Sequence, residues 1–176
     1  MKAFLIDRYG KNPGRLGEVP EPEPGISDVL VKVYASSVNL LDSKISKGEF
    51  KLILPYTFPL IMGNDLAGVV VRVGSGVRTF KPGDEVYYAG AIGRPGTNAE
   101  YHLVDERIVG LKPKSLSFAE AAALPLTAIT AYEALFDRLK VADPVLGAER
   151  AILITGGAGG VGSIAIQLAK TLTDLK

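Results

Sequence analysis

Residues 150–162, RAILITGGAGGVG, are the stretch that decides the fold of this chain. The stretch opens with a short apolar run containing β-branched residues, which is typical of a strand buried on both faces of a parallel sheet. The run then breaks into glycines spaced as Gly157-x-Gly159-x-x-Gly162, and apolar residues at helical spacing follow from Ile164 onward. This order of strand, glycine turn and helix predicts the first βα unit of a dinucleotide-binding fold.

The glycines have a chemical reason to be there. A dinucleotide pyrophosphate must approach the bare N–H groups at the positive end of a helix, and a Cβ would hold it away. The first glycine allows a tight turn, the second leaves room for phosphate and the third lets the helix pack on the strand. We therefore expect a cofactor-binding turn made of Gly157, Ala158, Gly159, Gly160, Val161 and Gly162. The alternative is a tight βα turn that binds no ligand.

The sequence ends soon after this motif, at Lys176. The residue that reads the adenosine ribose is expected about 20 residues beyond the glycines, so the choice between NADP and NAD stays open. One strand and one helix cannot bury a core of their own, because half of such a domain needs βαβαβ. We therefore expect the chain to be the N-terminal part of a longer protein.

Composition narrows the class of protein. The 20 Lys and Arg nearly balance the 19 Asp and Glu, which argues against a nucleic-acid surface or an acidic tail. The chain has no cysteine, which excludes disulfides and thiolate metal ligands. The N-terminal apolar run is too short for a signal peptide, and no later run reaches the length of a membrane span. We expect a cytoplasmic protein that acts on a small molecule and contacts neither nucleic acid nor a membrane.

Short strands separated by turn signals predict an irregular β-barrel or sandwich over residues 1–110. The segment Lys81-Pro82-Gly83-Asp84 predicts a type II turn, with proline and glycine at its two central positions. The expected strands cover residues 2–6, 29–35, 66–73, 85–88 and 99–104.

The pattern changes to helices after residue 116. Ser117 and Glu120 have the spacing of a capping box, which opens an alanine-rich helix over residues 118–124. Pro125 interrupts it, and a second helix is predicted over residues 127–139. The expected boundary therefore divides a first domain, residues 1–125, from a second domain that begins at residue 126.

Several stretches resemble one known family, in that family's order along the chain. They are ASSVNLLD at 35–42, GNDLAG at 63–68, KPGDEV at 81–86, AEY at 99–101, residues 121–132 and the glycine turn at 156–162. The chain resembles the medium-chain dehydrogenase/reductase superfamily, within its quinone-oxidoreductase and zinc-type-alcohol-dehydrogenase-like branch.

The resemblance implies a mixed α/β fold class. A GroES-like β-barrel substrate domain would cover residues 1–125, and the first βα unit of a truncated Rossmann domain would cover residues 126–176. The resemblance also implies NADPH or NADH as cofactor and, for the full-length protein, a homodimer.

The metal site of the zinc enzymes in this superfamily is not repeated here. By resemblance, those enzymes carry a cysteine where this chain has Asn39, and a histidine–glutamate pair where it has Asn64 and Asp65. Asparagine is a poor zinc ligand, and His102 has no neighbouring ligand in its strand-like run, which favours a structural or surface role. We expect no metal and no zinc, and Asn64 and Asp65 then form a polar turn before a strand. A zinc alcohol dehydrogenase with displaced ligands is the alternative.

Three residues are the catalytic candidates. The resemblance places Asn39 near the nicotinamide, where its amide could donate to the reacting oxygen, although it also suits a helix cap. Tyr56 lies on a loop where its phenol could orient a carbonyl or simply pack. Thr127 resembles a threonine that lines the nicotinamide side of the cleft, or it caps a helix. Asp42 would support a neighbour or cap a helix.

These residues favour one function. Without a Lewis acid, the site must polarise its substrate by hydrogen bonds, which favours easily reduced acceptors. We expect a zinc-independent NAD(P)H-dependent oxidoreductase that transfers hydride to a quinone or enone. A non-catalytic relative that senses a dinucleotide or binds a partner is the alternative from another class.

Overall fold

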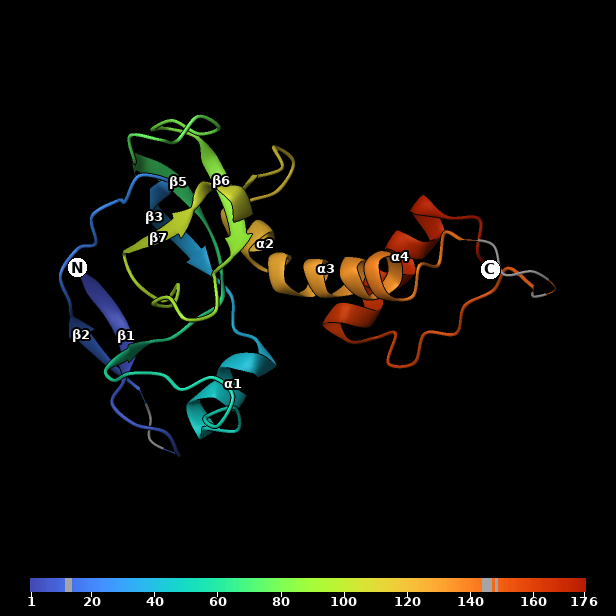
Figure 1. Ribbon diagram of the computed structural model, residues 1–176, viewed down its shortest axis with the longest axis horizontal. Helices are drawn as coiled ribbons and strands as arrows, with labels where there is room; N and C mark the ends of the chain where they lie inside the picture. Colours follow the sequence, from blue (N-terminus) through green and yellow to red (C-terminus); the bar gives the residue numbers. More distant parts are fainter. Residues whose placement is uncertain (12–13, 144–146, 148) are drawn as a thin grey trace. The chain divides into compact units, whose positions relative to one another are not determined.

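The computed structural model describes residues 1–11, 14–143, 147 and 149–176. The chain forms two compact units, Met1–Pro125 (unit 1) and Leu126–Lys176 (unit 2), each with its own apolar core (Figure 1). No helix in the described ranges is both long and apolar enough to cross a membrane.

Unit 1 is built around a five-stranded antiparallel sheet. Its two central strands, β3 (Asp28–Ser36) and β5 (Asp65–Val73), are the longest, and their valines bury one face of the sheet. The strand order is β7-β3-β5-β6-β8. The three outer strands are β6 (Glu85–Ala89), β7 (Tyr101–Asp105) and β8 (Gly110–Leu111), with a 3₁₀ turn at Glu106–Ile108 between the last two.

A second, three-stranded sheet has the order β2-β1-β4. Its strands are β1 (Lys2–Ile6), β2 (Arg15–Glu18) and β4 (Leu60–Ile61), and a single bridge joins Ala3 to Ala99. The expected barrel or sandwich therefore takes the form of two open sheets in the described residues. Helix α1 (Leu40–Lys47) adds Ile45 to a small core that includes Ile6, Leu60 and Met62.

The turn and cap predictions are confirmed. Gly83 has a φ of 97°, and the Asp84 N–H donates to the Lys81 carbonyl over 3.2 Å, as a type II turn requires. Ser117 and Glu120 form the capping box that opens α2 (Phe118–Ala122).

The helix boundaries differ from those predicted. Helix α3 (Pro125–Tyr132) begins at Pro125, because a proline at the first helical position loses no internal hydrogen bond. The expected continuation to residue 139 becomes a π-helical turn at Glu133–Arg138, where the Leu139 N–H reaches back five residues to the Ala134 carbonyl over 3.0 Å. Pro125 is thus the first residue of α3, whereas the sequence predicts that Pro125 interrupts a helix.

Unit 2 packs α4 (Gly160–Leu172) against α3 and the π-helical turn, through small and aliphatic side chains. The predicted strand at residues 151–154 is wrong as a regular strand. The segment makes two sheet-like backbone bonds, both to Lys176, whose N–H donates to Arg150 (3.0 Å) and whose carbonyl accepts from Ile152 (3.1 Å). Arg150 and Ile152, the two neighbours of Ala151, both bond to Lys176, which is the hydrogen-bond pattern of parallel strands. This short parallel pairing stands where a full ladder was expected.

Candidate functional site

The glycine turn lies at the start of α4, and its left-handed residue is Gly156. Gly156 has a φ of 69°, a conformation that glycine adopts at no steric cost. The spacing predicts that Gly157 makes the tight turn, but in the structure Gly156 has the left-handed conformation of that turn. Gly159 is the N-cap of α4 and offers no side-chain oxygen to the first helical N–H groups.

The second and third glycines of the motif have different surroundings. A Cβ at Gly162 would lie 2.3 Å from the Gly156 carbonyl oxygen, so the helix could not pack as closely on the turn. A Cβ at Gly159 would meet only that same oxygen, at 3.3 Å, so the space beyond it is open. Room at the second glycine and close packing at the third are what a bound pyrophosphate needs, and these residues fit such a group.

Thr127 lies beside the same turn, inside unit 2. A Cβ at Gly160 would lie 3.0 Å from Cγ2 of Thr127, which makes Thr127 a direct neighbour of the first turn of α4. Because α3 begins at Pro125, Thr127 is its third residue and not its N-cap.

In unit 1, a buried carboxylate organises the other candidates. Asp65 is fully buried, and its Oδ2 accepts from Ser37 Oγ over 3.0 Å and from Asn39 Nδ2 over 2.9 Å. Asp65 is also the first residue of β5, where it pairs with Ala89. The expected polar turn is therefore wrong for Asp65, because the strand begins one residue earlier than the apolar run.

Asn39 is the N-cap of α1, and its amide faces inward to the protein. Its amide nitrogen donates to Asp65 Oδ2 over 2.9 Å and lies 3.3 Å from Ser37 Oγ, which it also contacts as a donor. Asn39 thus occupies the capping position expected as its alternative, and its amide nitrogen is held by partners inside unit 1.

Asp42 ties the same helix to the strand beside it. One carboxylate oxygen accepts from the Asn39 backbone N–H (2.7 Å), and the other accepts from Asn64 Nδ2 (2.5 Å). Burial raises the pKa of Asp42, and these two hydrogen bonds only partly offset it. Asp42 thus both caps α1 and holds Asn64.

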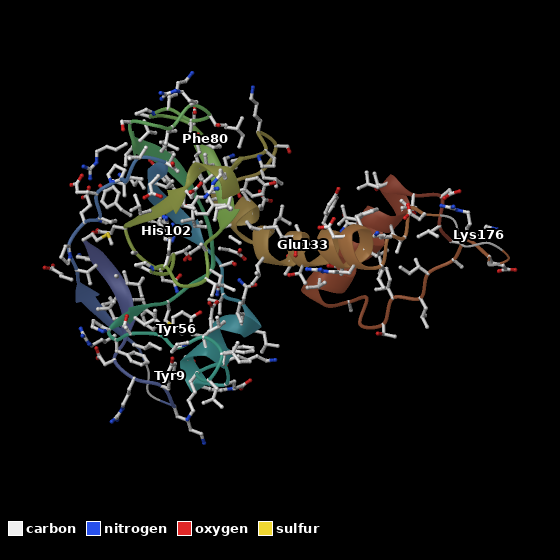
Figure 2. The ribbon with its side chains drawn as sticks, in the orientation of Figure 1. Tyr9, Tyr56, Phe80, His102, Glu133 and Lys176 are labelled. Carbon is white, nitrogen blue, oxygen red and sulfur yellow. The ribbon has the colours of Figure 1, made fainter. Side chains whose placement is uncertain are left out.

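Tyr56 is a half-buried residue on the loop before β4, packed against the small core of α1 (Figure 2). Its backbone N–H donates to the Tyr9 hydroxyl over 3.0 Å. Within the described ranges, the Tyr56 hydroxyl itself has no hydrogen-bond partner. Burial raises the pKa of Tyr56, so the phenol keeps its proton and can donate it.

A small hollow in unit 1 brings three of these side chains together. Asp42, Tyr56 and Asn64 line it, with walls from residues 60–63 and 90–96. Its volume is about 30 Å³, the share of one water molecule, so this hollow by itself does not enclose a substrate.

The residues at the three zinc positions are close together but do not fit zinc. Asn39, Asn64 and Asp65 supply one carboxylate, and that carboxylate already accepts two hydrogen bonds. In the part of the chain that the structure describes, no three His, Cys, Asp or Glu side chains gather as a metal site. A zinc site needs three or four such ligands.

His102 is buried and structural, one of the two roles expected for it. Its Nε2 lies 3.1 Å from the Pro95 carbonyl, so Nε2 carries the proton, and its Nδ1 then accepts from the Tyr88 hydroxyl over 2.9 Å. Burial lowers the pKa of His102 to about 4, so the ring is neutral near pH 7.

One contact of this site has no signal in the sequence. Nothing in the pattern around Ser37 marks it as a partner of Asp65, since the two are 28 positions apart. The bond between Asn39 and Asp42, by contrast, agrees with the capping alternative that their spacing predicts.

The two open sheets of unit 1 and the glycine turn of unit 2 have the layout of the dehydrogenase and reductase class expected from the sequence. Residues 25–125 match the alcohol dehydrogenase GroES-like domain. The chain therefore belongs to this family, within the medium-chain dehydrogenase/reductase superfamily.

Two curated relatives differ in what their names say. A zinc-type alcohol dehydrogenase-like protein of Staphylococcus aureus is 46% identical over 154 residues, which cover 87% of this chain and 45% of that protein. A 2-methylene-furan-3-one reductase of Solanum lycopersicum is 45% identical over 178 residues, covering 97% of this chain and 44% of the reductase. The chain thus spans about half the length of the curated relatives it matches.

A solved structure gives the same fold. The quinone oxidoreductase of Escherichia coli, in complex with NADPH, matches with a TM-score of 0.81 and 29% identity, covering 99% of this chain and 51% of that one.

Proposed function

We propose that this chain is part of a zinc-independent NAD(P)H-dependent oxidoreductase that passes hydride to a quinone or an enone. The observation that carries the proposal is the glycine turn, where Gly159 leaves open space and Gly162 packs on backbone. The names of relatives add support, since one is a furanone reductase and another is a quinone oxidoreductase with NADPH bound.

The glycine turn would hold the cofactor. The N–H groups at the start of α4 would donate to the pyrophosphate, because no side chain caps them. Thr127 would border the same space from α3. When bound, the nicotinamide supplies the hydride.

Tyr56 is the residue we propose for polarising the acceptor. Its protonated hydroxyl would donate to the carbonyl oxygen, where negative charge develops as hydride arrives at carbon. Asp42 and Asn64 would keep the wall of the hollow rigid, because they are hydrogen-bonded to each other and Asp42 also accepts from the Asn39 backbone N–H. The acceptor would bind at the open side of the hollow, since its volume is small.

The residues at the zinc positions do not fit a metal, so we propose acceptors that can be reduced without one. A simple aldehyde is harder to reduce and gains more from a strong electrophile at its oxygen, whereas quinones and enones accept hydride with hydrogen-bond assistance alone.

An acceptor panel tests the proposal. The enzyme that contains this chain is mixed with NADPH or NADH and a quinone, an enone or a simple aldehyde, and cofactor oxidation is followed. We expect turnover with quinones or enones and little with aldehydes. Aldehyde reduction alone, or no turnover with any acceptor, would contradict the proposal.

A further inference from the structure

A second pocket lies on unit 1, separated from the hollow at Asp42 by the loop at residues 94–96, which lines both. Its volume is about 380 Å³ and most of its lining is apolar. Pockets of this size and polarity are typical of small-molecule sites. None of the candidate residues Asn39, Tyr56 and Thr127 lines it, so the proposed reaction does not account for it.

One wall is a strap of alternating residues, Val19-Pro20-Glu21-Pro22-Glu23. Pro20 and Pro22 line the pocket, whereas Glu21 and Glu23 both bind Arg72 of β5 at 2.6 Å. Extended chain places alternate residues on opposite sides, which explains this division. The rigid proline rings and the shared arginine hold this wall in place without a ligand.

Another part of the lining comes from β7, through Tyr101, His102 and Leu103. His102 donates to the Pro95 carbonyl and so fixes the loop that closes the pocket on a third side. Both ring nitrogens of His102 have partners, so it supports the wall and offers no group to a ligand. The wall is therefore apolar, aromatic and preformed.

The polar groups at the pocket indicate what kind of ligand fits. Arg94 donates to Asp28 over 2.8 Å, and the two charges neutralise each other. In the part of the chain that the structure describes, this is the one side-chain hydrogen bond of Arg94, so other N–H groups of its guanidinium can donate. A ligand that carried its own charge would be repelled by the member of the pair with the same sign, a cation by Arg94 and an anion by Asp28.

We propose that this pocket is a second small-molecule site, which takes a compact, uncharged aromatic molecule with one hydrogen-bond acceptor. The ring lies among the prolines, Tyr101 and Leu103, and the acceptor receives an N–H from Arg94. This inference does not depend on the proposed reaction.

Amide NMR shifts of the 176-residue chain, titrated with three probes, test the site. Anisole has the ring and the oxygen, ethylbenzene is its near-isostere without oxygen, and benzoate adds a charge. We expect anisole to shift the amides of Tyr101, His102 and Leu103, with ethylbenzene and benzoate about three- to tenfold weaker. Shifts centred on Asp42 and Asn64, or no saturable shift, would overturn the proposal, as would equal or tighter binding of either control.

Two variants add a steric test. Leu103→Trp fills the pocket and should abolish anisole binding, whereas Leu111→Trp changes an exposed leucine on β8 and should leave it unchanged. If Leu103→Trp fails to fold, Pro22→Phe blocks the pocket from the strap, outside any sheet. Undiminished anisole binding in a folded blocking variant would contradict the proposal.

Discussion

Single side chains in unit 1 differ in whether their donors are already engaged, and this decides their roles. The Asn39 amide nitrogen already donates to Asp65 and Ser37 inside the protein. The Tyr56 hydroxyl has no such partner in the described ranges, and its raised pKa keeps it protonated. Of the two residues named as substrate-facing donors, Tyr56 is therefore the one whose donor remains available.

Replacing Tyr56 with phenylalanine removes that donor and nothing else. We expect kcat for quinone or enone reduction to fall about 100-fold, because a donor to the developing oxyanion is lost. The KM for the cofactor should stay unchanged. The matched control is Tyr34→Phe, which removes the hydroxyl of an exposed tyrosine on β3. Steady-state kinetics measure both constants. A parental kcat in Tyr56→Phe would show that the Tyr56 hydroxyl does not assist the reaction.

His102 gives a prediction about stability and pH. Its pKa is about 4 in the folded chain against an ordinary value near 6.5, so the unfolded chain binds the extra proton first as pH falls. The contribution of neutral His102 to the free energy of unfolding is fully present above pH 6.5. It is lost between pH 6.5 and 4, by about 3 kcal/mol.

Urea unfolding at a series of pH values measures this loss. The variant His102→Gln can still donate to Pro95 but does not titrate, so its free energy of unfolding should fall less steeply over that window. Equal slopes in the parent and the variant would mean that His102 titrates normally.

The start of α4 is the element on which the cofactor proposal depends. Gly162→Ala would push a Cβ into the Gly156 carbonyl, so we expect unit 2 to lose about 1–3 kcal/mol of stability. Gly159→Ala has more room, and its φ of −77° suits any residue, so the unit should fold normally. Because its methyl enters the proposed phosphate space, dinucleotide binding should weaken.

Thermal unfolding of both variants, together with cofactor titration of the enzyme that contains the chain, separates these two effects. Parental cofactor affinity in Gly159→Ala would argue that the turn binds no pyrophosphate. An undisturbed Gly162→Ala would argue against close packing at that glycine.

The elements also show what local sequence can and cannot predict. Turn and cap signals act over a few residues, which is why Pro82-Gly83 and the Ser117 capping box could be predicted. The prediction of a strand at residues 151–154 failed because a ladder depends on partners far along the chain, and among the described residues Lys176 alone makes sheet-like bonds there. The same applies to Asp65, whose burial depends on Ser37 and Asn39 from other segments.

At the scale of the whole molecule, relatives of this chain include proteins named for zinc, whereas the residues at the corresponding positions here do not suit zinc. Residues 25–125 match the alcohol dehydrogenase GroES-like domain, and one relative is named a zinc-type protein. The positions that resemble the zinc ligands hold two amides and one carboxylate, and their polar atoms bond to one another and to Asp42. Our account is therefore that reduction proceeds without a metal, through the cofactor and a hydrogen-bond donor.

Zinc content measured together with activity tests this account most directly. The purified enzyme that contains this chain is analysed for zinc, treated with a chelator and assayed for NAD(P)H-dependent reduction of a quinone or enone. We predict far less than one zinc per chain and unchanged activity after chelation, since three zinc ligands are not available at this site. Stoichiometric zinc, with activity that is lost on chelation and restored by adding zinc back, would contradict it.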